Sequence, residues 1–215
     1  MLGYYNYTVW LTYGSLVSSM AGLLLGFCGY PARAALCLLI CAILDAFDGT
    51  VARTKSDRTE KEKRYGIQID SFSDFMAFGV LPCAVGYGLF FKSNQPVWMI
   101  VLYGIASCLL VLAAMIRLAN FNVEEECRQE ETHGRRTSYT GMPVIITAGI
   151  MPLLVIAIKL LNLEMVGFAL FVVSMPVLGL LFLHKKVQIR KPIGKSLVVL
   201  LFCGIVEVLL LLKCL

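Results

Sequence analysis

Long apolar segments constrain this chain more than any other feature. A helix needs about 20 predominantly apolar residues to cross the hydrocarbon core of a bilayer, and about seven such segments follow one another here. Hydrophobic residues make up 59% of the 215 residues and charged residues only 15%, whereas soluble domains carry about 25% charged residues. We therefore expect an all-α, polytopic transmembrane bundle of about seven spans (six to eight), forming a single domain over residues 1–215. The expected spans are 9–28, 33–53, 66–91, 97–121, 141–162, 165–183 and 195–213.

The basic residues predict how this bundle is oriented. The connections 54–65, 122–140 and 184–195 hold most of the 19 Lys and Arg residues, and all three fall on one side of a seven-span arrangement. By the positive-inside rule this side and the N-terminus are cytoplasmic. The cations favour anionic lipid headgroups and a phosphate-bearing substrate, although cations that only fix topology would give the same pattern. We expect an integral protein of a prokaryotic inner membrane, in contact with the lipid bilayer and with no nucleic acid.

Four aspartates interrupt the apolar pattern. Asp45 and Asp48 lie in the second expected span, and Asp70 and Asp74 lie in the third. Carboxylates in a membrane are costly, and they persist only where a cation, a partner or water compensates them. Because a helix advances 100° per residue, spacings of three and four residues keep each pair on one face. We expect the two pairs to face each other at the cytoplasmic ends of neighbouring helices.

A divalent-metal site would compensate such a group of acids. Mg²⁺ and Mn²⁺ prefer carboxylate oxygens together with substrate phosphates. Two such ions about 3.5–4 Å apart can hold both oxygens of an in-line phosphoryl displacement. Structural ion pairs with arginines, or a cation pathway in a transporter, are the alternative explanations. Residues 45–74 are therefore a candidate catalytic motif.

Small and basic residues beside the aspartates fit a nucleotide. Gly49 and Ala52 lie on the aspartate face of the second span, where they leave room for a nucleotide to approach the helix. Arg53 follows directly, and a guanidinium group can bind a phosphate through two parallel hydrogen bonds. The expected substrate is therefore a phosphate-bearing nucleotide compound.

The order of these residues resembles the signature of the CDP-alcohol phosphatidyltransferases, D-x-x-D-G-x-x-A-R followed by G-x-x-x-D-x-x-x-D. Every signature residue is present, namely Asp45, Asp48, Gly49, Ala52, Arg53, Gly66, Asp70 and Asp74. The family usually has eight or nine residues between the Arg and the second Gly, whereas this chain has twelve. The additional residues fall in the charged linker, so we expect them to lengthen the loop without disturbing either helix face.

Three further segments are similar to the phosphatidylserine synthases of that family. Residues 70–82 (DSFSDFMAFGVLP) resemble D-S-x-x-D-x-x-x-F-G-V-x-P. Residues 117–123 (RLANFNV) resemble R-L-A-R-F-N-V, with Asn120 where an arginine is common, and residues 139–143 (YTGMP) resemble F-x-G-L-P. The likeness covers the first five expected spans.

The resemblance implies that CDP-diacylglycerol and L-serine are converted to phosphatidylserine and CMP. The ligands of two divalent cations, Mg²⁺ or Mn²⁺, would be Asp45, Asp48, Asp70 and Asp74. Asp74 would also act as the general base that deprotonates the serine hydroxyl. The CDP moiety would contact Asp48, Gly49, Ala52, Arg53 and Gly66. We expect serine to contact Arg117, Asn120 and Thr140, and we expect a homodimer.

Two groups of alternatives remain open at this point. The same chemistry would serve another acceptor, such as inositol phosphate, glycerol phosphate or an archaeal serine lipid. A membrane cation transporter would use the acids as a relay, and a non-catalytic scaffold would not need them. CMP release with each acceptor separates the first group, whereas tolerance of Arg53→Ala or Asp74→Asn would favour the second.

Overall fold

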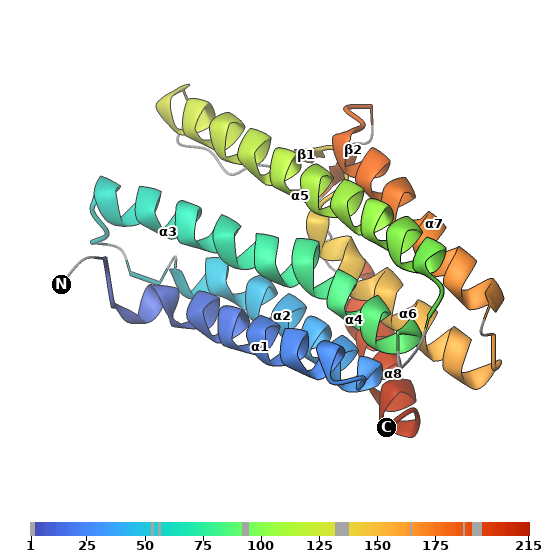
Figure 1. Ribbon diagram of the computed structural model, residues 1–215. Coiled ribbons are helices and arrows are strands. Elements are labelled where there is room, and N and C mark those ends of the chain that lie inside the picture. Colours follow the sequence, from blue (N-terminus) through green and yellow to red (C-terminus); the bar gives the residue numbers. More distant parts are fainter. Residues whose placement is uncertain are drawn as a thin grey trace.

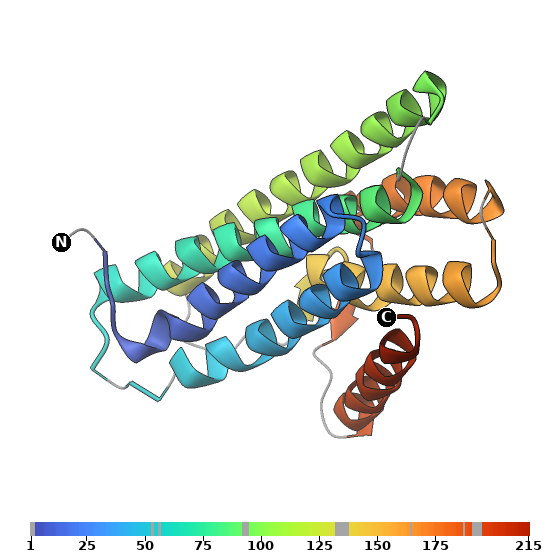
Figure 2. The same ribbon diagram turned by 60° about the horizontal axis from the view of Figure 1, so that its bottom comes forward.

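Helices form nearly all of the described structure, and α1 to α7 pack side by side as a bundle (Figures 1 and 2). The computed structural model describes residues 3–52, 54–55, 57–91, 95–131, 138–163, 165–186, 188–190 and 195–215. The side chains of 128–131, 138–140, 188–190 and 195–201 are outside this description. The first half contains η1 (Tyr7–Val9), α1 (Trp10–Phe27), α2 (Pro31–Ala52), α3 (Glu60–Asp74), η2 (Phe75–Val80), α4 (Leu81–Phe90) and α5 (Val97–Glu131). The second half contains β1 (Ser138–Thr140), η3 (Val144–Ile146), α6 (Thr147–Leu160), α7 (Met165–Leu183), β2 (Gln188–Arg190) and α8 (Lys195–Lys213).

The helical class is confirmed, with one short addition. β1 and β2 pair antiparallel, with Tyr139 opposite Ile189. Helix α8 contacts α2 and α6. The two strands are only three residues long each, so the architecture remains that of a helix bundle.

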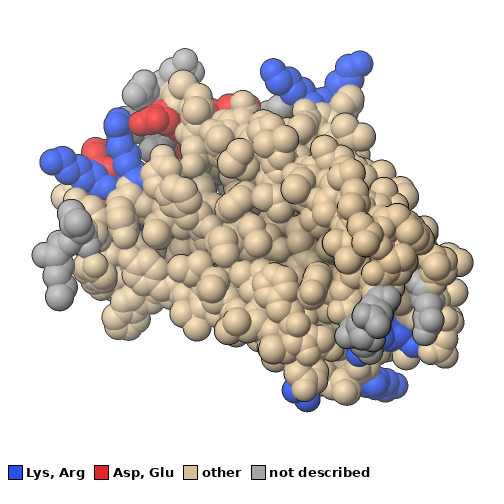
Figure 3. Space-filling model, in the orientation of Figure 1, with Lys and Arg blue, Asp and Glu red and all other residues tan. Residues whose placement is uncertain are grey.

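Five helical segments of the described chain are long and apolar enough to cross a membrane. They are Tyr7–Phe27, Pro31–Ala52, Glu60–Phe90, Val97–Cys127 and Met165–Leu183. The apolar segment Val144–Leu160 is shorter. Figure 3 shows a broad face without charged side chains between groups of Lys and Arg residues at opposite ends. These features support a membrane protein, while the count of seven spans, the cytoplasmic orientation and the homodimer stay predictions.

Three expected boundaries were wrong. The fifth expected span, 141–162, starts before any helix, because η3 begins at Val144 and α6 at Thr147. Helix α3 begins at Glu60 rather than at residue 66, because Thr59 and Glu62 form a capping box: Glu62 N donates to Thr59 Oγ1 at 3.2 Å and Thr59 N donates to Glu62 Oε2 at 2.8 Å. Helix α5 continues to Glu131 rather than ending at residue 121. Its additional residues are mostly polar and include several good helix formers, so the helix continues beyond its apolar stretch.

A change of helix type follows the last aspartate directly. The π-helix η2 begins at Phe75, one residue after Asp74. Pro82 has no N–H and cannot donate to the carbonyl of Phe78, four residues earlier. Thr147 Oγ1 donates to that carbonyl instead, at 3.0 Å. The irregular segment is thus anchored to α6, and π-turns of this kind are frequent at functional sites.

Close contacts with α1 fix the position of α3 and α4. A Cβ atom at Gly26 of α1 would lie 2.5 Å from the carbonyl oxygen of Ala84 in α4, so only glycine allows this approach. Nearer the site, Ser73 Oγ donates to the carbonyl of Thr12 at 3.1 Å. The continuous helical segment Glu60–Phe90, which carries two of the aspartates, is therefore held against α1 at Ser73 and at Ala84.

Candidate functional site

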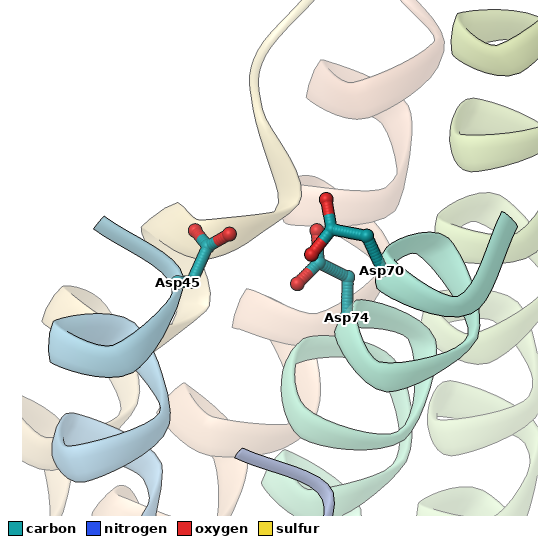
Figure 4. Close-up of side chains that lie close together, drawn as sticks. All are labelled: Asp45, Asp70 and Asp74. Carbon is teal, nitrogen blue, oxygen red and sulfur yellow. The ribbon is translucent and has the colours of Figure 1, made fainter. Parts of the chain in front are cut away.

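Three carboxyl groups converge from two helices. Asp45 on α2 and Asp70 and Asp74 on α3 each place one oxygen within 4.8 Å of the others (Figure 4). All three side chains are partly buried, and Asp70 Oδ1 has no hydrogen-bond partner among the described residues. Like charges at such separations repel one another. Oxygen ligands of this kind match the preference of Mg²⁺ and Mn²⁺, so the residues fit a divalent-metal site.

Asp48 lies beside this cluster rather than within it. Thr12 Oγ1 of α1 donates to Asp48 Oδ2 at 3.4 Å. Its carboxyl group also interacts with that of Asp70, and both residues line the same cavity. The structure thus brings three of the four predicted ligands together and places the fourth next to them.

An open cavity of about 200 Å³ adjoins the aspartates. Three of its lining residues are Gly49, Ala52 and Gly66, which the sequence predicts to contact CDP. The other lining residues are Thr8, Val9, Thr12, Asp48, Arg58, Lys63, Ile67 and Asp70. Arg53 lies outside the described residues, so its place in the site stays a prediction. The cavity has acids on α2 and α3, and it has cations at the linker and at the start of α3.

Part of this cavity comes from segments that the sequence did not single out. Thr8 and Val9 belong to η1, where the first candidate span begins. Arg58 belongs to the charged linker, whose cations we interpreted only as a group, as a determinant of orientation and as a charge that favours phosphate-bearing ligands. Glu62 joins these segments, because its Oε1 accepts from Asn6 Nδ2 at 2.9 Å and from Lys55 Nζ at 3.0 Å. The hydrogen bond to Glu62 raises the pKa of Lys55. The capping box was the available signal that the linker folds back onto α3.

The predicted serine-binding residues lie on α5 and beyond. Arg117 is buried, and its guanidinium lies 5.8 Å from the centroid of the Phe121 ring. Asn120 is exposed and donates to Glu124 Oε1 at 2.9 Å. The side chain of Thr140 is outside the described part. Arg117 and Asn120 are not among the residues that line the cavity, so their role stays a prediction.

The segments that resemble phosphatidylserine synthases contact one another. Ser71 Oγ donates to Asn122 Oδ1 at 2.7 Å, which joins residues 70–82 to residues 117–123. At Gly141, φ is +78° and a Cβ atom would lie 3.2 Å from Arg117 Nε. Glycine adopts this backbone conformation without steric cost, and it leaves the space that Arg117 occupies. Segments far apart in the sequence thus form one connected region.

These features define a helical protein with several helices of membrane-spanning length and a carboxylate cluster beside an open cavity. Residues 5–180 match the family model of the CDP-alcohol phosphatidyltransferases. The chain belongs to this family, and the matched range contains every residue of the aspartate motif.

Several relatives share a narrower similarity. The chain is 28% identical over 138 residues to a CDP-diacylglycerol–serine O-phosphatidyltransferase of Saccharomyces cerevisiae, covering 64% of this chain and 46% of the relative. It is 33% identical over 122 residues to the enzyme of that name from Helicobacter pylori, covering 56% and 45%. It is 30% identical over 131 residues to an archaetidylserine synthase of Methanothermobacter thermautotrophicus, covering 61% and 49%. The matched part spans a little less than half the length of each relative.

Proposed function

We propose that this protein transfers the phosphatidyl group of CDP-diacylglycerol to L-serine, giving phosphatidylserine and CMP. The observation that carries the proposal is the convergence of Asp45, Asp70 and Asp74 beside a cavity lined by the small residues of the family motif. The names of the yeast and bacterial relatives support serine as the acceptor.

The aspartates would hold two divalent cations, Mg²⁺ or Mn²⁺. Asp45, Asp70 and Asp74 supply the converging oxygens, and Asp48, whose carboxyl group interacts with that of Asp70, would join them. Asp70 Oδ1 supports this assignment, since a buried carboxylate oxygen without a hydrogen-bond donor is unfavourable unless a cation satisfies it. When bound, the cations would stabilise the negative charge on the leaving CMP.

The cavity would hold the CDP moiety. Gly49 and Ala52 on α2 and Gly66 on α3 leave its walls without bulky side chains. Asp48 would contact the nucleotide from the same wall, and Arg53 would bind a phosphate. The phosphorus that carries the lipid would then lie near the aspartates.

Asp74 would act as the general base. The serine hydroxyl oxygen attacks the phosphorus that carries the diacylglycerol group, and its proton passes to an Asp74 carboxylate oxygen. The bond between that phosphorus and the bridging oxygen breaks, and CMP leaves with the electron pair. A positioned base of this kind contributes about 10²–10⁴-fold to the rate. The fixed position of α3 against α1 supports this role.

Arg117 would bind the serine carboxylate, because a guanidinium group forms two parallel hydrogen bonds with a carboxylate. Asn120 and Thr140 would contact the rest of the amino acid. The buried position of Arg117, where the synthase-like segments meet, supports this assignment.

An acceptor assay tests the proposal. Purified protein receives CDP-diacylglycerol with serine, glycerol phosphate or inositol phosphate, and CMP release is measured. Of the three acceptors, we expect only serine to give CMP release. Release with glycerol phosphate but not with serine would overturn the choice of acceptor. A parallel assay with a CDP-activated archaeal lipid tests the second candidate, an archaeal serine lipid synthase, which the similarity to the archaetidylserine synthase favours.

A further inference from the structure

We propose that Arg58 binds a phosphate group of the CDP-activated lipid. Arg58 lies in the linker between α2 and α3, the segment that is longer here than is usual for the family. The inference rests on the proposed function, because it assigns a ligand group to the same cavity. It adds a residue outside the family signature to the phosphate-binding set.

The side chain of Arg58 crosses α3 at a glycine and reaches the cavity. A Cβ atom at Gly66 would lie 2.6 Å from Arg58 Nη2, so any larger residue would displace the guanidinium. Arg58 Nη2 donates to the carbonyl of Glu62 at 3.2 Å, and Nη1 donates to the carbonyl of Ala52 at 3.4 Å. The group therefore lies between the last residue of α2 and the first turns of α3, facing the cavity that Asp70 also lines.

The guanidinium group retains donors for an anion. It has five N–H donors, and two of them serve the bonds to Ala52 and Glu62. Arg58 Nε is buried and has no hydrogen-bond partner in the described part of the chain. Leaving a buried donor without an acceptor is unfavourable, and a phosphate oxygen would satisfy it.

No carboxylate among the described residues neutralises the charge of Arg58. Lys63, the other described cation of the cavity lining, forms an ion pair with Glu60 at 2.7 Å. Lys55 forms an ion pair with Glu62 at 3.0 Å. No ion pair among the described residues includes Arg58. A phosphate-bearing substrate would therefore meet, in the cavity that Asp48 and Asp70 also line, a cation that has no ion-pair partner among the described residues.

The linker is held on both sides of Arg58. Glu62 binds Lys55 before it and Thr59 after it, which restricts the backbone that carries the guanidinium. A group positioned before the ligand arrives loses less conformational freedom on binding. This makes Glu62 a positioning residue for Arg58.

The test compares Arg58→Ala with Lys61→Ala. Lys61 is exposed and does not line the cavity, so its variant loses the same charge near the start of α3 without changing the site. CMP release gives kcat and both KM values. We expect Arg58→Ala to raise the KM for CDP-diacylglycerol about tenfold or more, with the KM for serine unchanged. Equal KM values for CDP-diacylglycerol in the two variants would overturn the proposal.

Two further measurements separate this proposal from its alternatives. If Arg58 only capped α2, Arg58→Ala would lower the melting temperature and leave the KM for CDP-diacylglycerol unchanged, which would also overturn it. Binding of CDP-diacylglycerol to the same variants, measured without an acceptor, tests Arg58 even if serine fails as the substrate. Weaker binding by Arg58→Ala than by Lys61→Ala supports the proposal, and equal binding contradicts it.

A double-variant cycle tests the contact with Gly66. Gly66→Ala should raise the KM for CDP-diacylglycerol when Arg58 is present, because the new methyl group displaces the guanidinium. In the Arg58→Ala background, Gly66→Ala should raise the KM for CDP-diacylglycerol by a much smaller factor. An equal effect in both backgrounds would contradict the placement of Arg58 across Gly66.

Discussion

The helix pairs α2–α3 and α6–α7 belong to one bundle but differ in what lies between them. The first pair brings three carboxyl groups together beside an open cavity. In the second pair, α7 has no charged residue, and the charge of Lys159 on α6 lies at a helix end, where its Nζ donates to the carbonyl of Cys214 at 2.8 Å. Met151 on α6 and Phe171 on α7 are fully buried, and Phe171 packs edge-on against Phe90 of α4. One half of the bundle thus supplies the site, and the other supplies packing that supports it.

Removal of divalent metal should affect the first pair most strongly. Treatment with a chelator should abolish CMP release, because the converging carboxylates would lose the cations that offset their repulsion. Addition of Mg²⁺ or Mn²⁺ should restore it. Circular dichroism should show that the helical content is unchanged. Full CMP release in the presence of excess chelator would contradict the assignment of the cluster as a metal site.

Asp74→Asn should have the next largest effect. The amide can neither accept the serine proton nor supply the carboxylate charge, so kcat should fall by about 10²–10⁴-fold while the protein remains folded in the membrane. Asp57→Asn is the matched control, because Asp57 is exposed in the linker and should retain wild-type turnover. Substantial turnover by the Asp74 variant would contradict its role as the base.

A variant in the second pair should change stability without changing the site. Leu178 on α7 is only 3% exposed, and truncation of a buried leucine costs about 2–5 kcal/mol. Leu178→Ala should therefore lower the unfolding midpoint and leave the KM for CDP-diacylglycerol unchanged. Leu180→Ala on the same helix, where the side chain is 71% exposed, should shift the midpoint little. A changed KM in the Leu178 variant would show that the two pairs are not separable.

The contact between α3 and α5 should give the smallest effect. Ser71→Ala and Asn122→Ala each remove the 2.7 Å hydrogen bond between these helices, and one hydrogen bond contributes about 0.5–1.5 kcal/mol. Each variant should lower kcat/KM for serine by about two- to tenfold. The double variant should have a kcat/KM for serine only slightly lower than that of either single variant. Losses that add up in the double variant would show that the two residues act independently.

The aspartate cluster was predictable because helical spacing places Asp70 and Asp74 on one face of α3, and the short linker brings that helix back beside Asp45 of α2. The start of α3 was missed because the expected span followed hydropathy and overlooked the capping box of Thr59 and Glu62. Hydropathy likewise gave no signal that α5 would continue past its apolar stretch.

The position of Arg58 depends on tertiary structure, since a charged linker residue is usually solvated and only the fold brings it across Gly66. The spacing of Arg117 and Asn120 suggested a shared face. Residues three apart differ by about 60° in direction, and here this suffices to bury one and expose the other.

Mn²⁺ binding, measured by electron paramagnetic resonance on the purified protein with CDP-diacylglycerol present, tests the central claim most directly. The wild-type chain should bind two Mn²⁺ ions. Asp70→Asn should lose at least one of them, because it removes the carboxylate whose Oδ1 has no hydrogen-bond partner among the described residues. The same number of bound ions and the same affinity in both proteins would contradict the account.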